Sequence, residues 1–146
     1  AHDSTGLTTA EMDELVEHRD MAILAWEKAI AATVIHYIND VIADISAYGA
    51  DAVAGTVGTD AATYSFKDFA KHWGEAKGFG LWFQFNPHSP MTDEQFLALH
   101  TALGMNAPGY VPGSGGDYMT YVNGLTEARD LIGTVYGFET DAVENW

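Results

Sequence analysis

A histidine and a glutamate three residues apart, His72 and Glu75, are the first side chains in this chain whose spacing could support chemistry. On a helix, residues three apart lie on neighbouring turns, so an imidazole and a carboxylate can reach the same metal ion. A zinc site needs three or four ligands in all, so this pair would need further donors. Without them, His72 is a histidine on the flank of a helix, hydrogen-bonded to its neighbours.

A second pair, His36 and Asp40, is spaced four residues apart, and Asp44 follows one turn later. Small residues on the same side of this helix would let another helix or a ligand approach. If that helix meets the one carrying His72 and Glu75, the four side chains of the two pairs make a mixed nitrogen and oxygen site suited to iron or zinc. The alternative interpretation is an interhelical histidine that forms hydrogen bonds.

The two arginines of the chain, Arg19 and Arg129, both fall within stripes of apolar residues. Arg19 stands four residues before Ile23, and Arg129 stands between Leu125 and Ile132. A guanidinium stays charged, so its burial requires a carboxylate partner or an anionic ligand. Two interpretations follow for these arginines, a structural ion pair with one of the abundant acids or a site for a carboxylate or phosphate ligand.

The charge of the chain limits its partners. Its 146 residues include 21 Asp and Glu against 6 Lys and Arg, a formal net charge of -15 that repels nucleic acid and attracts cations and basic partners. There is no cysteine, so any metal must use histidine, carboxylate or carbonyl ligands. No nucleophile elbow, P-loop, dinucleotide-binding glycine pattern or zincin helix is present, and we do not expect an enzyme.

One very long helix must carry the second histidine pair. Thr8 and Glu11 form a capping-box pattern that predicts its start. Apolar residues then recur in steps of three, four or multiples of these from Leu15 to Tyr48, and Gly49 offers an end. A helix of this length should touch several neighbours and form the centre of the fold.

Shorter helices follow it. The pattern predicts a long connection over 49–64, a second helix from Ser65 that fails near Asn86 and Pro87, a third helix from a capping box at Thr92 to Gly104, a Pro- and Gly-rich loop, a last long helix from Asp117 to Gly137, and a short turn over 140–146. We therefore expect an all-α helical bundle of about four helices that forms a single domain over residues 1–146.

The first residue of the chain and the length of its apolar runs bear on where in the cell the protein is found. The chain begins with Ala1 rather than methionine, which is consistent with a removed signal, with a fragment or processed form of a longer precursor, or with simple removal of the initiator methionine; of these we expect an exported protein. The longest apolar run, residues 78–85, is too short to cross a bilayer, which takes about 20 residues, so no transmembrane segment is predicted.

Several stretches of the C-terminal half carry a family resemblance. They are Lys71-His72-Trp73 through Gly78-Phe79-Gly80-Leu81, then Gln84-Phe85-Asn86-Pro87-His88-Ser89-Pro90, and finally Ala128-Arg129-Asp130-Leu131, Tyr136-Gly137-Phe138 and Asn145-Trp146. Together they are similar to an uncharacterised bacterial lipoprotein domain often encoded beside imelysin-like proteins. The resemblance implies an extracytoplasmic protein in an iron-regulated context.

The stretch Ala70-Lys71-His72-Trp73-Gly74-Glu75 is also similar to the Gly-x-His-x-x-Glu motif of imelysins, with Ala70 at the glycine position. Imelysins are helical-bundle proteins associated with iron uptake. This more distant resemblance implies a role for His72 and Glu75 in metal binding.

The leading hypothesis is a periplasmic or extracellular helical protein that binds or helps handle iron, zinc or another metal during uptake. Its partner would be the metal ion itself, with a homo-oligomer or a complex with an iron-uptake protein as the expected assemblies. The candidate metal ligands are His72, Glu75, His36 and Asp40.

The alternative hypothesis is a protein interaction or assembly module with no bound metal. It would dock a partner through the aromatic and Gly-rich second helix, because exposed apolar patches mark such interfaces. The exposure of Trp73, Trp82 and Phe83 decides whether that surface exists.

Overall fold

The computed structural model describes residues 6–105 and 118–146, and every regular element in these ranges is a helix. The elements are α1 (Thr9–Ala54), α2 (Phe66–Gly80), the 3-10 helix η1 (Leu81–Phe85), α3 (Asp93–Leu103), α4 (Tyr118–Tyr136) and α5 (Thr140–Asn145). This confirms the all-α fold with a very long first helix. The predicted Pro- and Gly-rich loop at 106–117 lies outside the described residues.

The start of α1 follows the predicted capping box. The backbone N–H of Glu11 donates to Thr8 Oγ1 at 3.3 Å, and the backbone N–H of Thr8 donates to Glu11 Oε2 at 2.8 Å. Two N–H groups that a helix start leaves without partners are satisfied in this way.

The end of α1 lies later than predicted. The helix passes through Gly49 and stops at Ala54, where Gly55 takes the left-handed conformation with φ of 70°. One interior glycine costs a helix only about 1 kcal/mol, and tertiary contacts hold the extra turn. The buried carboxylate of Asp51 accepts a hydrogen bond of 2.7 Å from the backbone N–H of Tyr64, which lowers the pKa of Asp51.

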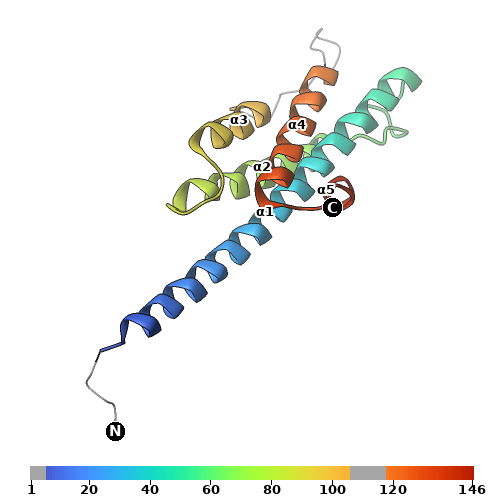
Figure 1. Cartoon of the computed structure of the whole chain (residues 1–146). Helices are drawn as coiled ribbons and strands as arrows, with labels where there is room; N and C mark the ends of the chain where they lie inside the picture. Colours follow the sequence, from blue (N-terminus) through green and yellow to red (C-terminus); the bar gives the residue numbers. More distant parts are fainter. Residues whose placement is uncertain (1–5, 106–117) are drawn as a thin grey trace.

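The C-terminal half of α1 lies at the centre of the core. α2, α4 and α5 all pack against it, and α3 packs against α2 and α4 (Figure 1). The side chains at the centre of this core have no exposed surface; among them are Val34, Ile35, Ile38, Val41, Leu99, Leu125 and Ile132. Because burial of each such side chain contributes about 1.5–3 kcal/mol, this cluster accounts for the bundle's stability.

The C-terminal segment, expected as a short turn, forms the short helix α5, which packs against α4 and α1. Gly133 permits this close approach, since a Cβ atom built there would lie only 2.8 Å from Cγ2 of the buried Val143. Asn39 of α1 ties the end of the chain down, donating hydrogen bonds of 2.9 Å to the carbonyls of Val143 and Trp146.

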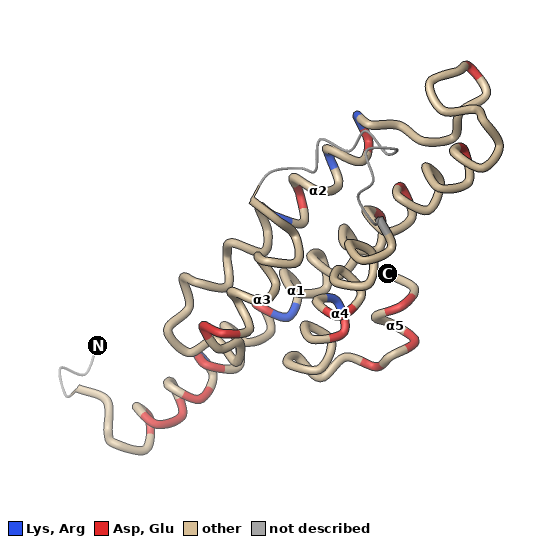
Figure 2. Tube along the Cα trace, turned by 90° about the horizontal axis from the view of Figure 1, so that it is seen from above, with Lys and Arg blue, Asp and Glu red and all other residues tan. Residues whose placement is uncertain are grey.

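The N-terminal half of α1 projects away from the other helices (Figure 1). Every residue from Thr9 to Trp26 is exposed, and burial begins at Glu27. Acidic residues are concentrated in this half, as the red segments near the N-terminus of Figure 2 show. The helix therefore has a packed half and a half that no other described element covers.

Within the described ranges, α1 is also the one helix long and apolar enough to cross a membrane, with a mean hydropathy of 1.3 over its most apolar stretch. That criterion rests on length and composition, and the core helix of a bundle meets it as well. The expectation that the chain has no transmembrane segment stays a prediction.

Three glycines provide a test of this packing. A Cβ atom added at Gly74 or Gly78 of α2 would have no other side chain or element within 4 Å, whereas one added at Gly133 meets Val143. Gly74→Ala and Gly78→Ala should each raise the free energy of unfolding by about 0.5–1 kcal/mol, because alanine loses less backbone entropy. Gly133→Ala should lower it by about 1–2 kcal/mol through overpacking.

Urea unfolding followed by circular dichroism measures all three variants. Stabilisation by Gly133→Ala would show that α5 does not sit against α4 as described.

Candidate functional site

The contact between α1 and α2 brings together most of the predicted histidine and carboxylate residues. Nδ1 of His72 lies 2.8 Å from Asp44 Oδ2, and its Nε2 lies 3.9 Å from Asp40 Oδ2. Asp40 Oδ2 is also 3.4 Å from Nε2 of His36. The sequence left open whether these two helices meet; in the structure they do, and His36, Asp40 and His72 lie together, with Asp44 making the shortest contact to His72.

Glu75, the remaining predicted ligand, lies elsewhere. The ring of Tyr37 stacks with His72 at a centroid distance of 6.3 Å and with Phe79 at 6.0 Å, so it links the histidine cluster to Phe79. Glu75 instead borders an apolar groove together with Phe79. Among residues 6–105 and 118–146, no group of three or more histidine and carboxylate side chains is arranged to hold a metal ion.

Partial burial sets the character of the histidine cluster. The side chains of His72 and Asp44 are 21% and 20% exposed. Loss of solvation raises the pKa of Asp44, and its hydrogen bond to His72 opposes that rise. This contact fixes the orientation of the imidazole and leaves Nε2 of His72 facing Asp40.

The two arginines differ in their surroundings. Arg19 is half exposed and pairs with the adjacent Asp20 at 2.7 Å, because its stretch of α1 projects from the fold. The side chain of Arg129 is 13% exposed, pairs with Asp130 at 2.9 Å, and donates from Nη1 to Asn39 Oδ1 at 3.2 Å. Both arginines therefore have partners within the protein, and the hydrogen bond from Arg129 to Asn39 links α4 to α1.

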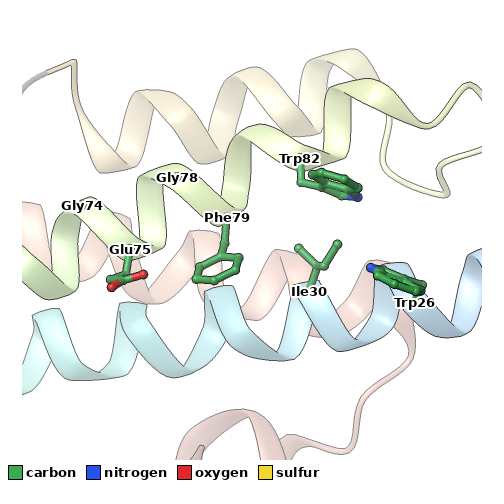
Figure 3. A pocket seen from close by; sticks show the side chains of 7 residues that line it. All are labelled: Trp26, Ile30, Gly74, Glu75, Gly78, Phe79 and Trp82. Atoms are coloured by element: carbon green, nitrogen blue, oxygen red, sulfur yellow. The ribbon is translucent and has the colours of Figure 1, made fainter.

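An apolar groove runs between α1 and the α2–η1 segment. Figure 3 shows Phe79 and Trp82 pointing from that segment toward Ile30 and Trp26 of α1. The groove has two adjoining parts of about 500 and 420 Å³, which share Trp26 and Trp82. These two tryptophans are 70% and 50% exposed, although both lie within the groove.

The aromatic side chains of the α2–η1 segment lie partly in the core and partly on the surface. Phe83 is buried, and Trp73 is half-buried and donates from Nε1 to the carbonyl of Leu103 at 2.8 Å. Trp82 and Phe85 are exposed, and their rings meet edge to face at 6.1 Å. An exposed aromatic surface of the kind that the interaction hypothesis requires is therefore present.

Glu27 forms the floor of the second part of the groove and is only 2% exposed. Its Oε1 accepts hydrogen bonds from the hydroxyls of Ser89 and Tyr136, the latter at 2.7 Å, and its Oε2 accepts one from the amide of Asn86. These contacts tie α1 to α4 and to the segment after η1. Burial, together with this contact, raises the pKa of Tyr136.

The sequence contained a signal for Glu27 that the prediction missed. Glu27 follows Trp26 and precedes Ile30 by three residues, so it borders the apolar stripe of α1, as Arg19 does. A charged residue beside a buried stripe needs partners, and here those partners come from residues about 60 and 110 positions away in sequence.

No family model, curated protein or solved structure matches this chain in comparisons with known proteins. The resemblance to imelysins and their neighbouring lipoproteins stays a prediction.

His100 of α3 is a half-buried titratable group outside the groove, with both ring nitrogens buried. Among residues 6–105 and 118–146, neither of these nitrogens has a hydrogen-bond partner; the ring centroid lies 4.4 Å from that of Phe96, and the ring packs against Gly80. Burial, and then the nearby ammonium of Lys77, lower the pKa of His100. Lys77 itself donates to the carbonyls of His100 and Gly104, at the end of α3.

Protonation of His100 should therefore destabilise the α2–α3 contact. Below about pH 6.5 the unfolded chain binds a proton at this position while the folded chain does not, so stability is lost as pH falls. His100→Phe removes the titration but keeps a ring of similar size. Urea unfolding between about pH 7.5 and pH 5 should show wild type losing stability relative to His100→Phe, with exposed His88→Gln as control. A constant difference would contradict the assignment.

Proposed function

We propose that the protein is an interaction or assembly module that binds a partner protein through the exposed apolar side of α1 and the groove beside it. One observation carries the proposal: the apolar stripe that fills the core continues along the projecting half of α1, interrupted there by Arg19. Moving away from the core, the stripe has exposed fractions of 70% at Trp26, 36% at Ile23, 55% at Leu15 and 46% at Met12.

The arrangement of α2 indicates how a partner would bind. Further along α1, the same stripe packs against α2, and the α2–η1 segment ends at Phe85, beside Trp26. A helix placed on the projecting half of α1 would continue the packing that α2 begins. Each large apolar side chain covered in this way would contribute about 1.5–3 kcal/mol.

Charge defines the chemistry of the partner. Residues 9–26 hold five acidic side chains and one arginine, and the whole chain has a net charge of -15. A second copy of the chain or an anionic membrane would be repelled by this half of α1. The favoured partner is a protein segment with an apolar ridge flanked by lysines or arginines.

Export and an iron-regulated context are expectations from the sequence, and we retain both as proposals. An interaction module needs no catalytic residue, and we propose none.

Site-specific photo-crosslinking in the cells that make the protein tests the docking surface. A photoreactive phenylalanine at Leu15 lies in the stripe, and one at Glu17 lies on the opposite side of the same exposed turns. We expect one recurrent protein adduct from position 15, none from position 17, and loss of the adduct when Ile23→Asp places a charge in the stripe.

Circular dichroism and gel filtration confirm that each variant folds. Equal adducts from positions 15 and 17, or no adduct from position 15, would contradict a docking role for this stripe.

Metal handling is the second candidate, and the approach of His36 and His72 to the same oxygen of Asp40 favours it. A divalent ion bound there would use two imidazoles and a carboxylate, a set suited to zinc or ferrous iron. This function needs a side-chain adjustment, since the His72 Nε2 to Asp40 distance of 3.9 Å is longer than ligands of one ion require.

Titration calorimetry with Zn²⁺ and Fe²⁺ tests metal handling. If it is the function, one ion binds per chain, and His72→Ala weakens binding by about tenfold or more because it removes a ligand, while exposed His88→Ala does not. The absence of stoichiometric uptake, or uptake equal in the two variants, would dismiss this candidate.

A further inference from the structure

The part of the groove around Glu27 combines a buried carboxylate with aromatic walls. Trp26 of α1 and Trp82 and Phe85 of η1 form the walls, and Glu27 and Asn86 lie at the floor. We refer to these five residues as the Glu27 pocket. Its volume of about 420 Å³ is large enough for a long amino-acid side chain.

The negative charge of Glu27 has no positive partner among the described residues. Its three hydrogen bonds come from neutral groups, the amide of Asn86 and the hydroxyls of Ser89 and Tyr136. None of the salt bridges between described residues involves Glu27. The adjacent Lys28 is directed to the ring of Phe138, with Nζ 5.9 Å from the centroid.

The hydrogen bonds of Glu27 leave acceptor capacity on Oε2. Oε1 accepts two hydrogen bonds, whereas Oε2 accepts one, from Asn86, which lines the pocket with it. A carboxylate that is 2% exposed and has no counter-charge favours a cation close by.

The walls select the kind of cation. The faces of tryptophan and phenylalanine attract ammonium and guanidinium groups, and tryptophan does so most strongly. Trp82 and Phe85 meet at an interplanar angle of 73°, so they form a corner opposite Trp26. Apolar walls around two polar residues do not supply the oxygen ligands that a metal ion needs, whereas they suit the alkyl part of an organic cation.

We propose that the Glu27 pocket binds the ammonium or guanidinium group of a lysine or arginine side chain on the partner protein. The assignment of this cation to a partner protein rests on the proposed docking function. The pocket lies where the exposed stripe of α1 meets the end of η1, so a partner on the stripe would reach it. The guanidinium would face the carboxylate of Glu27 and stack between the aromatic walls.

Two pairs of probes test the proposal on the full chain, with binding followed by titration calorimetry. The first pair is an amphipathic helical peptide with leucines along one face and one central arginine, and the same peptide with citrulline, the neutral isostere of arginine. The second pair is N-acetyl-arginine amide and N-acetyl-citrulline amide. The protein variants are Glu27→Gln, which removes the charge, and Trp26→Leu, which alters an exposed wall without touching the buried hydrogen bonds.

We expect the arginine peptide to bind about tenfold tighter than the citrulline peptide, since cation and carboxylate meet away from water. This ratio should fall toward one in Glu27→Gln and should also decrease in Trp26→Leu. Should Glu27→Gln fail to fold, Trp26→Leu carries the test, because Trp26 is 70% exposed. If free N-acetyl-arginine amide binds as tightly as the arginine peptide, the cation site is supported and its ligand is a free organic cation.

A ratio of one in the wild type, or a ratio that neither substitution changes, overturns the cation site. If both peptides bind equally and Ile23→Asp abolishes their binding, docking on the stripe stands and only the cation inference fails. If neither peptide nor either amino-acid probe binds, the cation inference fails, and the cross-linking experiment alone decides the docking function.

Discussion

The fold depends on the apolar stripe of α1, which needs to be covered along its length. From Val34 onward the stripe is buried against α2 and α4, and this contact supplies the core. Toward the N-terminus the same repeat continues through Trp26, which borders the groove beside η1, to the exposed Leu15, over which no described element lies. Apolar surface in water is costly, and the proposed docking function rests on this contrast between a covered half and an open half of the stripe.

Glu27 marks the boundary between these two halves. It is the first buried residue of α1, and its hydrogen bonds from Asn86 and Tyr136 attach the end of the η1 segment and α4 to the helix at one level. Because Asn86 directly follows η1, this attachment positions Trp82 and Phe85 opposite Trp26. The buried polar network that closes the core thus also builds the groove at its edge.

Much of the helical architecture could be predicted from the sequence, because capping boxes and apolar periodicity are local signals. The box at Thr8 and the break before Pro87 were correct, whereas the end at Gly49 was wrong because distant residues hold the next turn. Periodicity reports which face of a helix is apolar but not whether another element covers it. For that reason Arg19 was expected to point inward, although it lies on an exposed turn.

The candidate site was predictable only in part for a related reason. The spacing of His36 and Asp40 put both on one face, and α2 brings His72 to that face as the sequence allowed. Glu75 shares a helix with His72, yet Glu75 borders the apolar groove, whereas His72 faces Asp40 and Asp44. Which side chains of two helices meet depends on the crossing angle and the axial register of the helices. The spacing of residues along one helix encodes neither.

Charge and apolar surface have separate roles in the proposed interaction. The apolar stripe and groove would supply affinity through burial, which does not distinguish one apolar helix from another. The acidic residues along the projecting half of α1 would speed the approach of basic partners and discourage self-association, and this effect weakens as salt rises. Glu27 differs from them because it is buried, so its interaction with a cation would be screened less by salt and would depend on fit. In this proposal the exposed acidic residues favour the approach of basic partners. The buried carboxylate of Glu27 then aligns a bound partner through one of its cationic side chains.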